Sequence, residues 1–149
     1  MEELNQNKSR RPNIMLLVVG ILYVVLSPFD ILAGLTLIAT TNFWLPSHGG
    51  EAMRTVWTMS YTATAVLGAY GVLLGILAIV KHSKPTEGRV LFTLGAVYVF
   101  VIVATQALRM YFGVFDYLGM GGFFPITLLF SIALPILYMI AANKNKGDD

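Results

Sequence analysis

The sequence predicts an all-α integral membrane protein, a bundle of four transmembrane helices with both termini in the cytoplasm. Three observations support this prediction. The chain of 149 residues is 56% hydrophobic and only 12% charged, which leaves too little polar surface for a water-soluble domain of this size. Its apolar residues form four long blocks. Most of its basic residues flank those blocks in the segments that an even number of crossings places on one side.

Each apolar block is long enough to cross the hydrocarbon core as a helix, which takes about 20 residues. The blocks are continuous and do not alternate, so helices are favoured over the strands of a barrel. The predicted helices span residues 14–41, 55–80, 90–112 and 123–142. They form one transmembrane domain, 14–142, between a cytoplasmic N-terminal segment, 1–13, and a cytoplasmic tail, 143–149. The first block is too long for the apolar core of a signal peptide, so we expect it to be retained.

The distribution of basic residues predicts the orientation. Of the ten lysine and arginine residues, eight lie before the first helix, around the turn between the second and third, or after the fourth. Only Arg54 and Arg109 lie on the other side. Because cytoplasmic loops are enriched in lysine and arginine, both termini are predicted to be cytoplasmic, in a multi-pass protein of the cell membrane. Topology thus explains the basic charge, and no nucleic-acid partner is expected.

A carboxylate interrupts the first apolar block. Asp30 lies two residues after Pro28 in the stretch VVLSPFDILAG, and a carboxylate facing lipid near the bilayer centre costs at least about 2.5–3.5 kcal/mol. Tyr23, Ser27 and Asp30 follow one another at spacings of four and three, so they share one helix face. We expect this face to point into the bundle. Pro28 in the first helix and Pro135 in the fourth are predicted to kink their helices and to free a backbone carbonyl.

The third helix carries a matching cation. Arg109 is the one basic residue inside an apolar block on the same half of the membrane as Asp30. Thr105 lies on the same stripe, and Gln106 lies on a neighbouring face. We expect Arg109 to pair with Asp30 across the contact between the first and third helices. Two interpretations stay open: a ligand-binding cavity in the outer half of the bundle, or a buried ion pair that fixes helix register. The candidate ligand-binding residues are Asp30, Arg109, Gln106, Tyr23, Ser27 and Thr105.

Small residues mark a packing face on the second helix. Gly68, Gly71 and Gly75 share one side, and the last two form a GxxxG pair that lets another helix approach closely. This face is expected to pack inside the bundle or, alternatively, in a homodimer. The first and third helices also match locally, since VGILYV recurs as LGAVYV 75 positions later. This match suggests a tandem duplication of a helical hairpin.

Catalytic and metal-binding patterns are weak. The sequence has no cysteine, which excludes disulfides and thiolate metal sites. Its two histidines, His48 and His82, are predicted on opposite sides of the membrane, and neither a serine triad nor a phosphate-binding glycine motif is present. We therefore expect no metal and no cofactor, and an enzyme is not favoured.

Two functions remain open at the level of the sequence. One is a protein that binds or passes a small amphipathic or anionic molecule, or a lipid, through the polar cavity. The alternative is a non-catalytic accessory or assembly subunit, in which the polar residues are a structural ion pair and the glycine face contacts a second copy or another protein of a larger membrane complex.

Overall fold

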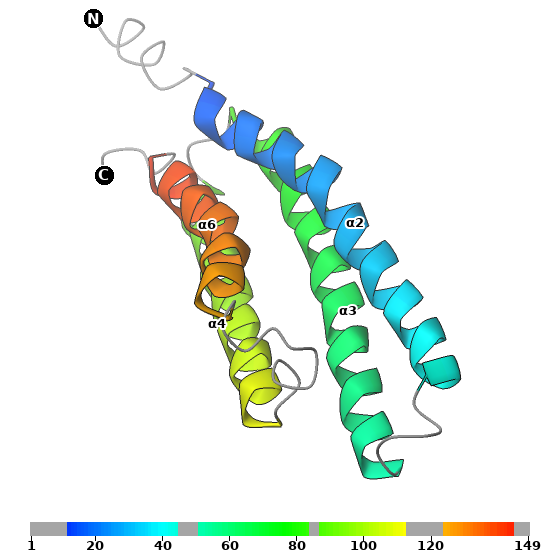
Figure 1. Ribbon diagram of the computed structural model, residues 1–149. Coiled ribbons are helices and arrows are strands. Elements are labelled where there is room, and N and C mark those ends of the chain that lie inside the picture. The colour runs from blue at the N-terminus through cyan, green and yellow to red at the C-terminus, as the bar shows by residue number, and fades with distance from the viewer. Residues whose placement is uncertain (1–11, 45–50, 84–86, 113–123, 145–149) are drawn as a thin grey trace, which may run out of the picture.

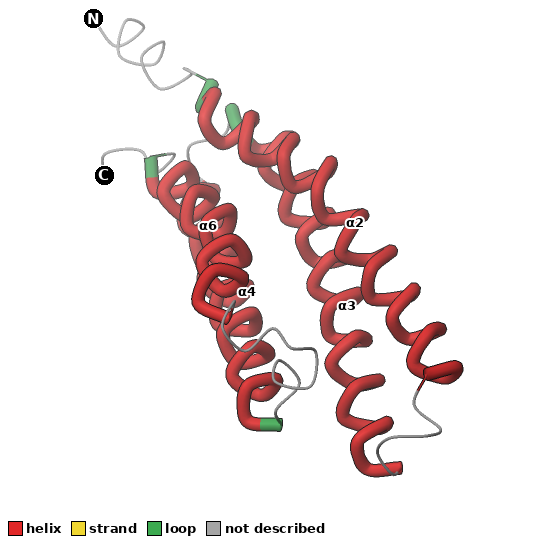
Figure 2. The backbone as a smooth tube through the Cα atoms, in the orientation of Figure 1, coloured by secondary structure: helices red, strands yellow, loops and turns green. Residues whose placement is uncertain are grey.

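The computed structural model describes residues 12–44, 51–83, 87–112 and 124–144, and these residues form an all-helical structure (Figure 1). The predicted all-α class with four helices is confirmed for this part of the chain. Figure 2 shows that the described residues outside the helices lie at helix ends. The predicted segments 1–13 and 143–149 fall largely outside the described residues. The helices are α2 (Ile14–Trp44), α3 (Glu51–Lys81), α4 (Gly88–Tyr111) and α6 (Phe124–Asn143).

Two helices extend furthest beyond their predicted ends. α2 continues to Trp44, past the predicted end at residue 41, and α3 begins at Glu51, before the predicted start at residue 55. Threonines in these turns stay compatible with the helix because their hydroxyls donate to the carbonyl four residues earlier, as Thr41 does to Leu37 (2.6 Å) and Thr55 does to Glu51 (3.0 Å). Hydropathy therefore marks where the apolar block ends, and the helix continues into the more polar turns.

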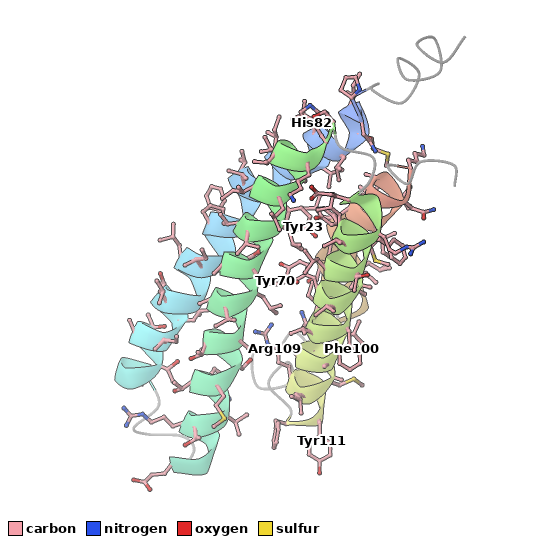
Figure 3. The ribbon with its side chains drawn as sticks, turned by 180° about the vertical axis from the view of Figure 1, so that it is seen from behind. Tyr23, Tyr70, His82, Phe100, Arg109 and Tyr111 are labelled. Atoms are coloured by element: carbon pink, nitrogen blue, oxygen red, sulfur yellow. The ribbon has the colours of Figure 1, made fainter. Side chains whose placement is uncertain are left out.

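Within the described part of the chain, three helices are long and apolar enough to cross a membrane, over Ile14–Thr41, Arg54–Lys81 and Gly88–Tyr111. In each span, only 28% of the most apolar 18-residue stretch is buried inside the protein. The outward side chains are large and apolar, and Phe100, 73% exposed, points away from the bundle (Figure 3). A surface of this kind is suited to lipid and not to water. In α6, the apolar stretch within the described residues, Ser131–Asn143, is shorter.

The helices are arranged as two pairs. α2 packs along α3, and α4 packs along α6 (Figure 1). Asn13 fastens one end of the bundle: its side-chain oxygen accepts from the Leu16 N–H (3.0 Å), which caps α2. Its backbone N–H donates to the His82 carbonyl (2.9 Å), and its side-chain amide donates to the Ala141 carbonyl (2.7 Å). One residue thus connects the start of α2 with the ends of α3 and α6.

Tyrosines form the middle of the core. Tyr23 of α2 meets Tyr98 of α4 and Tyr138 of α6 edge to face, with ring centroids 5.9 and 5.7 Å apart. Tyr98 donates to the Leu67 carbonyl of α3 (3.1 Å), and Tyr70 of α3 donates to a backbone carbonyl of α4 (3.3 Å). These reciprocal bonds hold α3 against α4 and bring the two helix pairs together around a shared aromatic cluster.

Candidate functional site

A cavity of about 360 Å³ lies where the two helix pairs meet. This volume is in the range of small-molecule sites. All four helices contribute to its wall, so it exists only in the assembled bundle. Figure 3 shows two of the lining side chains, Tyr23 and Arg109, directed between the helix pairs. The lining residues are Tyr23, Leu26, Ser27, Asp30, Thr64, Leu67, Tyr98, Ile102, Thr105, Gln106, Arg109, Ser131, Leu134 and Pro135.

The structure brings all six candidate ligand-binding residues to this one cavity. α2 supplies Tyr23, Ser27 and Asp30, and α4 supplies Thr105, Gln106 and Arg109. Residues three or four apart on a helix lie on one face, and here the two faces meet. Of the two predicted kink residues, Pro135 lines the cavity and lies inside the continuous helix α6; Pro28 lies inside α2, next to Ser27.

Arg109 is held by α3 and not by Asp30. Its Nε donates to the Ser60 hydroxyl (2.6 Å), and its Nη2 donates to the Ser60 carbonyl (2.8 Å) and to the Thr64 hydroxyl. The prediction that Arg109 forms an ion pair with Asp30 is wrong. The structure describes both residues, and no ion pair joins them. Ser60 and Thr64, one turn apart on the helix beside α4, present three oxygens to the guanidinium. Neutral acceptors therefore satisfy the hydrogen bonds that a carboxylate was expected to accept.

Asp30 has no protein partner among the residues that the structure describes. It is exposed, as is the neighbouring lining residue Leu26 (48% exposed), one turn earlier on α2. Its position, halfway along a span that is apolar over Ile14–Thr41, makes an unaccompanied carboxylate costly. The carboxylate therefore requires water, a proton or a ligand as its companion.

Two further polar atoms of the wall make no hydrogen bond with any residue that the structure describes. They are the hydroxyl of Tyr23, whose side chain is 2% exposed, and the amide oxygen Oε1 of Gln106, whose side chain is 8% exposed. A buried polar group without a partner costs about 1–3 kcal/mol. Because the large majority of buried polar groups in proteins are satisfied, these two wall atoms are exceptions to the usual pattern.

The glycine face of α3 packs against α2 within the chain. A Cβ at Gly68 would lie 2.8 Å from the Ser27 carbonyl oxygen, and one at Gly75 would lie 2.8 Å from the Gly20 carbonyl oxygen. At Gly71 an added Cβ would overlap the Ser27 hydroxyl. These approaches leave no space for a side chain, so the small residues set how closely α2 lies to α3. They also hold Ser27 at the cavity wall.

Ser60 and Ser131 were not singled out from the sequence as site residues. Ser60 is buried (9% exposed) and lies four residues before Thr64 and eight before Gly68, so it extends the glycine face by about two turns. This spacing is sufficient to place Ser60 on the same helix face from the sequence alone. Ser131 lines the cavity four residues before Pro135, at the carbonyl that a helical proline leaves without its usual donor.

The chain matches no protein-family model, no curated protein and no solved structure. The geometry of the cavity is therefore the basis for assigning a function.

Proposed function

We propose that this is a multi-pass protein of the cell membrane that binds or passes a small amphipathic or anionic molecule in the cavity between its helix pairs. One observation supports the proposal above the others. A cavity of about 360 Å³, lined by a carboxylate, a guanidinium and buried unsatisfied polar atoms, lies within a bundle whose outer faces are apolar. Polar groups at such a depth are costly, and they mark ligand or substrate paths in membrane proteins.

The proposed topology has four crossings. α6 contains 20 residues, which as a helix spans about 30 Å and matches the hydrocarbon core. α2 begins and α6 ends at the same end of the bundle (Figure 1). We place that end in the cytoplasm because Lys81 and Arg89 lie near it, together with most of the other basic residues of the sequence. The cavity then lies between the bilayer centre and the outer surface.

The orientation can be tested by labelling single cysteines, because the chain has none of its own. Glu51 and Ser83 are exposed residues at opposite ends of α3. In intact cells, an impermeant thiol reagent should label Glu51→Cys and leave Ser83→Cys unlabelled until the membrane is opened. Labelling of Ser83→Cys but not of Glu51→Cys would reverse the proposed orientation.

The cavity itself can be tested by filling it. Thr105 lines the cavity, and its hydroxyl donates only within α4, to the Val101 carbonyl (2.8 Å). Thr105→Trp should occupy much of the space without removing a contact between helices. We expect the purified variant to lose the small molecules or lipids that native mass spectrometry detects on the wild type.

Thr93 provides a matched control for this experiment. It is exposed on the same helix, and its hydroxyl makes the same kind of bond, to the Arg89 carbonyl (3.0 Å). Thr93→Trp should retain the bound molecules. Equal retention by both tryptophan variants would contradict a binding role for the cavity.

An accessory subunit that docks a partner through its glycine face is less well supported. That proposal requires the small-residue face of α3 to be turned outward. Gly68, Gly71 and Gly75 instead lie against α2 of the same chain. The close packing favours an internal role for these glycines and leaves the cavity as the feature to be explained.

The helix pairs are compatible with a duplicated hairpin. The matched glycines Gly20 and Gly95 each face the partner helix of their own pair, Gly20 at Ala78 and Gly95 at Tyr138. Their matched tyrosines, Tyr23 and Tyr98, meet each other, as two equivalent residues near a pseudo-twofold axis would. We propose on this basis that the cavity lies at the interface of two related repeats, where transporters commonly place their sites.

A further inference from the structure

Three side chains of the cavity wall already donate hydrogen bonds within the protein. Arg109 donates to Ser60 and Thr64 on α3. Thr105 donates to the Val101 carbonyl, and Tyr98 donates to the Leu67 carbonyl. An anion bound at Arg109 would have to compete with the oxygens of Ser60 and Thr64 for the guanidinium.

Three oxygen-bearing groups of the same wall make no hydrogen bond with a described residue. Asp30 makes no hydrogen bond or ion pair with another described residue. Gln106 Oε1 and the Tyr23 hydroxyl are buried in the wall without a partner. A carboxylate accepts hydrogen bonds and carries a negative charge, so a cationic donor is the ligand group that complements Asp30.

The contacts between helices indicate where the cavity is open. On the α3–α4 side, Tyr70, Tyr98 and Arg109 all bond across from one helix to the other. On the α2 side, the lining residues Leu26 and Asp30 are exposed, and the adjacent Phe29 is 65% exposed. A molecule at Asp30 is therefore reached past apolar side chains that face the hydrocarbon of the bilayer.

We infer that the cavity takes a cationic amphiphile, with a protonated amine at Asp30 and an alkyl chain along the exposed side of α2. The inference rests on the proposed function and specifies its ligand class. The ammonium group donates to the Asp30 carboxylate, and the amide oxygen of Gln106 and the hydroxyl of Tyr23 complete its hydrogen bonds. Leu26 and Phe29 contact the chain.

Four probes of defined chemistry test this ligand class on the full chain in a non-ionic detergent. Decylamine, decanoate and 1-decanol share the chain and differ in the charge of the head group; ethylamine has the same head group without the chain. We expect decylamine to bind and to raise the Tm, with decanoate, 1-decanol and ethylamine binding at least about tenfold more weakly. A charge-assisted hydrogen bond accounts for a factor of this size.

Substitutions of Asp30 test whether its carboxylate is the group that binds decylamine. Asp30→Asn removes the charge at an exposed residue without a described partner, so the chain should fold, and decylamine affinity should fall at least about tenfold. Asp30→Glu keeps the carboxylate and should therefore retain much of the wild-type affinity for decylamine. Glu51→Gln, which removes an exposed carboxylate at the start of α3, should bind decylamine as the wild type does.

The outcomes separate this inference from the proposed function. Tighter binding of decanoate than of decylamine, or decylamine binding that Asp30→Asn leaves unchanged, would overturn the cationic ligand and leave a ligand-binding cavity in place. Binding of ethylamine as tight as that of decylamine would overturn the amphiphile. If no probe binds and Thr105→Trp retains the same molecules as the wild type, the proposed function fails as well.

Discussion

Gly75→Leu should lower the free energy of unfolding by about 3 kcal/mol, at the upper end of the cost of overpacking a core. An added Cβ at residue 75 would lie 2.8 Å from the Gly20 carbonyl oxygen, the Tyr23 Cβ and the Val24 Cγ2. A backbone oxygen cannot rotate away, so α2 and α3 must separate. Because Tyr23 is part of this contact, the cavity wall moves with them. Thermal unfolding in detergent, followed by tryptophan fluorescence, measures the loss.

Ala69 serves as the matched control for this substitution. It lies on the same helix and is exposed, so Ala69→Leu should change the free energy of unfolding by no more than about 0.5 kcal/mol. A Gly75→Leu variant that unfolds at the wild-type temperature while a dimer dissociates would assign the glycine face to contact between chains and not to the inside of the bundle.

Arg109→Gln should destabilise the bundle by about 2–3 kcal/mol. The substitution removes the bonds from the guanidinium to the Ser60 hydroxyl, the Ser60 carbonyl and the Thr64 hydroxyl. Hydrogen bonds to charged groups contribute about 1.5–3 kcal/mol each, and the recovered cost of burying the charge offsets part of their loss. These bonds connect α3 with α4 at the end of the bundle away from Asn13, so their loss should loosen that end. Arg89→Gln, at an exposed arginine of the same helix, should have little effect.

Double-mutant cycles identify the partner of Arg109. Combining Arg109→Gln with Thr64→Val should give a coupling energy of about 1 kcal/mol, because the two side chains bond directly. Combining it with Asp30→Asn should give a coupling energy below about 0.5 kcal/mol. A larger coupling to Asp30 than to Thr64 would restore the ion pair that the sequence suggested.

The separation of Asp30 from Arg109 explains how the cavity can retain both charges. Each charge alone is costly in a membrane, and a direct pair would cancel them and leave a structural contact. With Arg109 satisfied by neutral oxygens on α3, the Asp30 carboxylate stays available on the exposed side of α2. In the cavity, Arg109 is hydrogen-bonded to α3, whereas Asp30 makes no ion pair with a described residue.

Helix periodicity was sufficient to predict which side chains share a face. Tyr23, Ser27 and Asp30 reach the cavity together because residues three and four apart lie on one side of any α-helix, whatever surrounds it. The same rule, with the cost of polar groups in lipid, identified Arg109 as a cavity residue. The glycine face of α3 follows similarly from small residues at fixed spacing.

Only the tertiary structure decided which groups meet across the helices. Periodicity orients a side chain about its own axis but fixes neither the neighbouring helix nor the depth at which two helices are aligned. Charge alone therefore favoured Asp30 as the partner of Arg109. In the structure α3 packs beside α4, and the guanidinium instead donates hydrogen bonds to Ser60 and Thr64. The unsatisfied oxygens of Tyr23 and Gln106 were equally beyond the sequence, because a polar atom lacks a partner only with respect to every neighbour that the fold places around it.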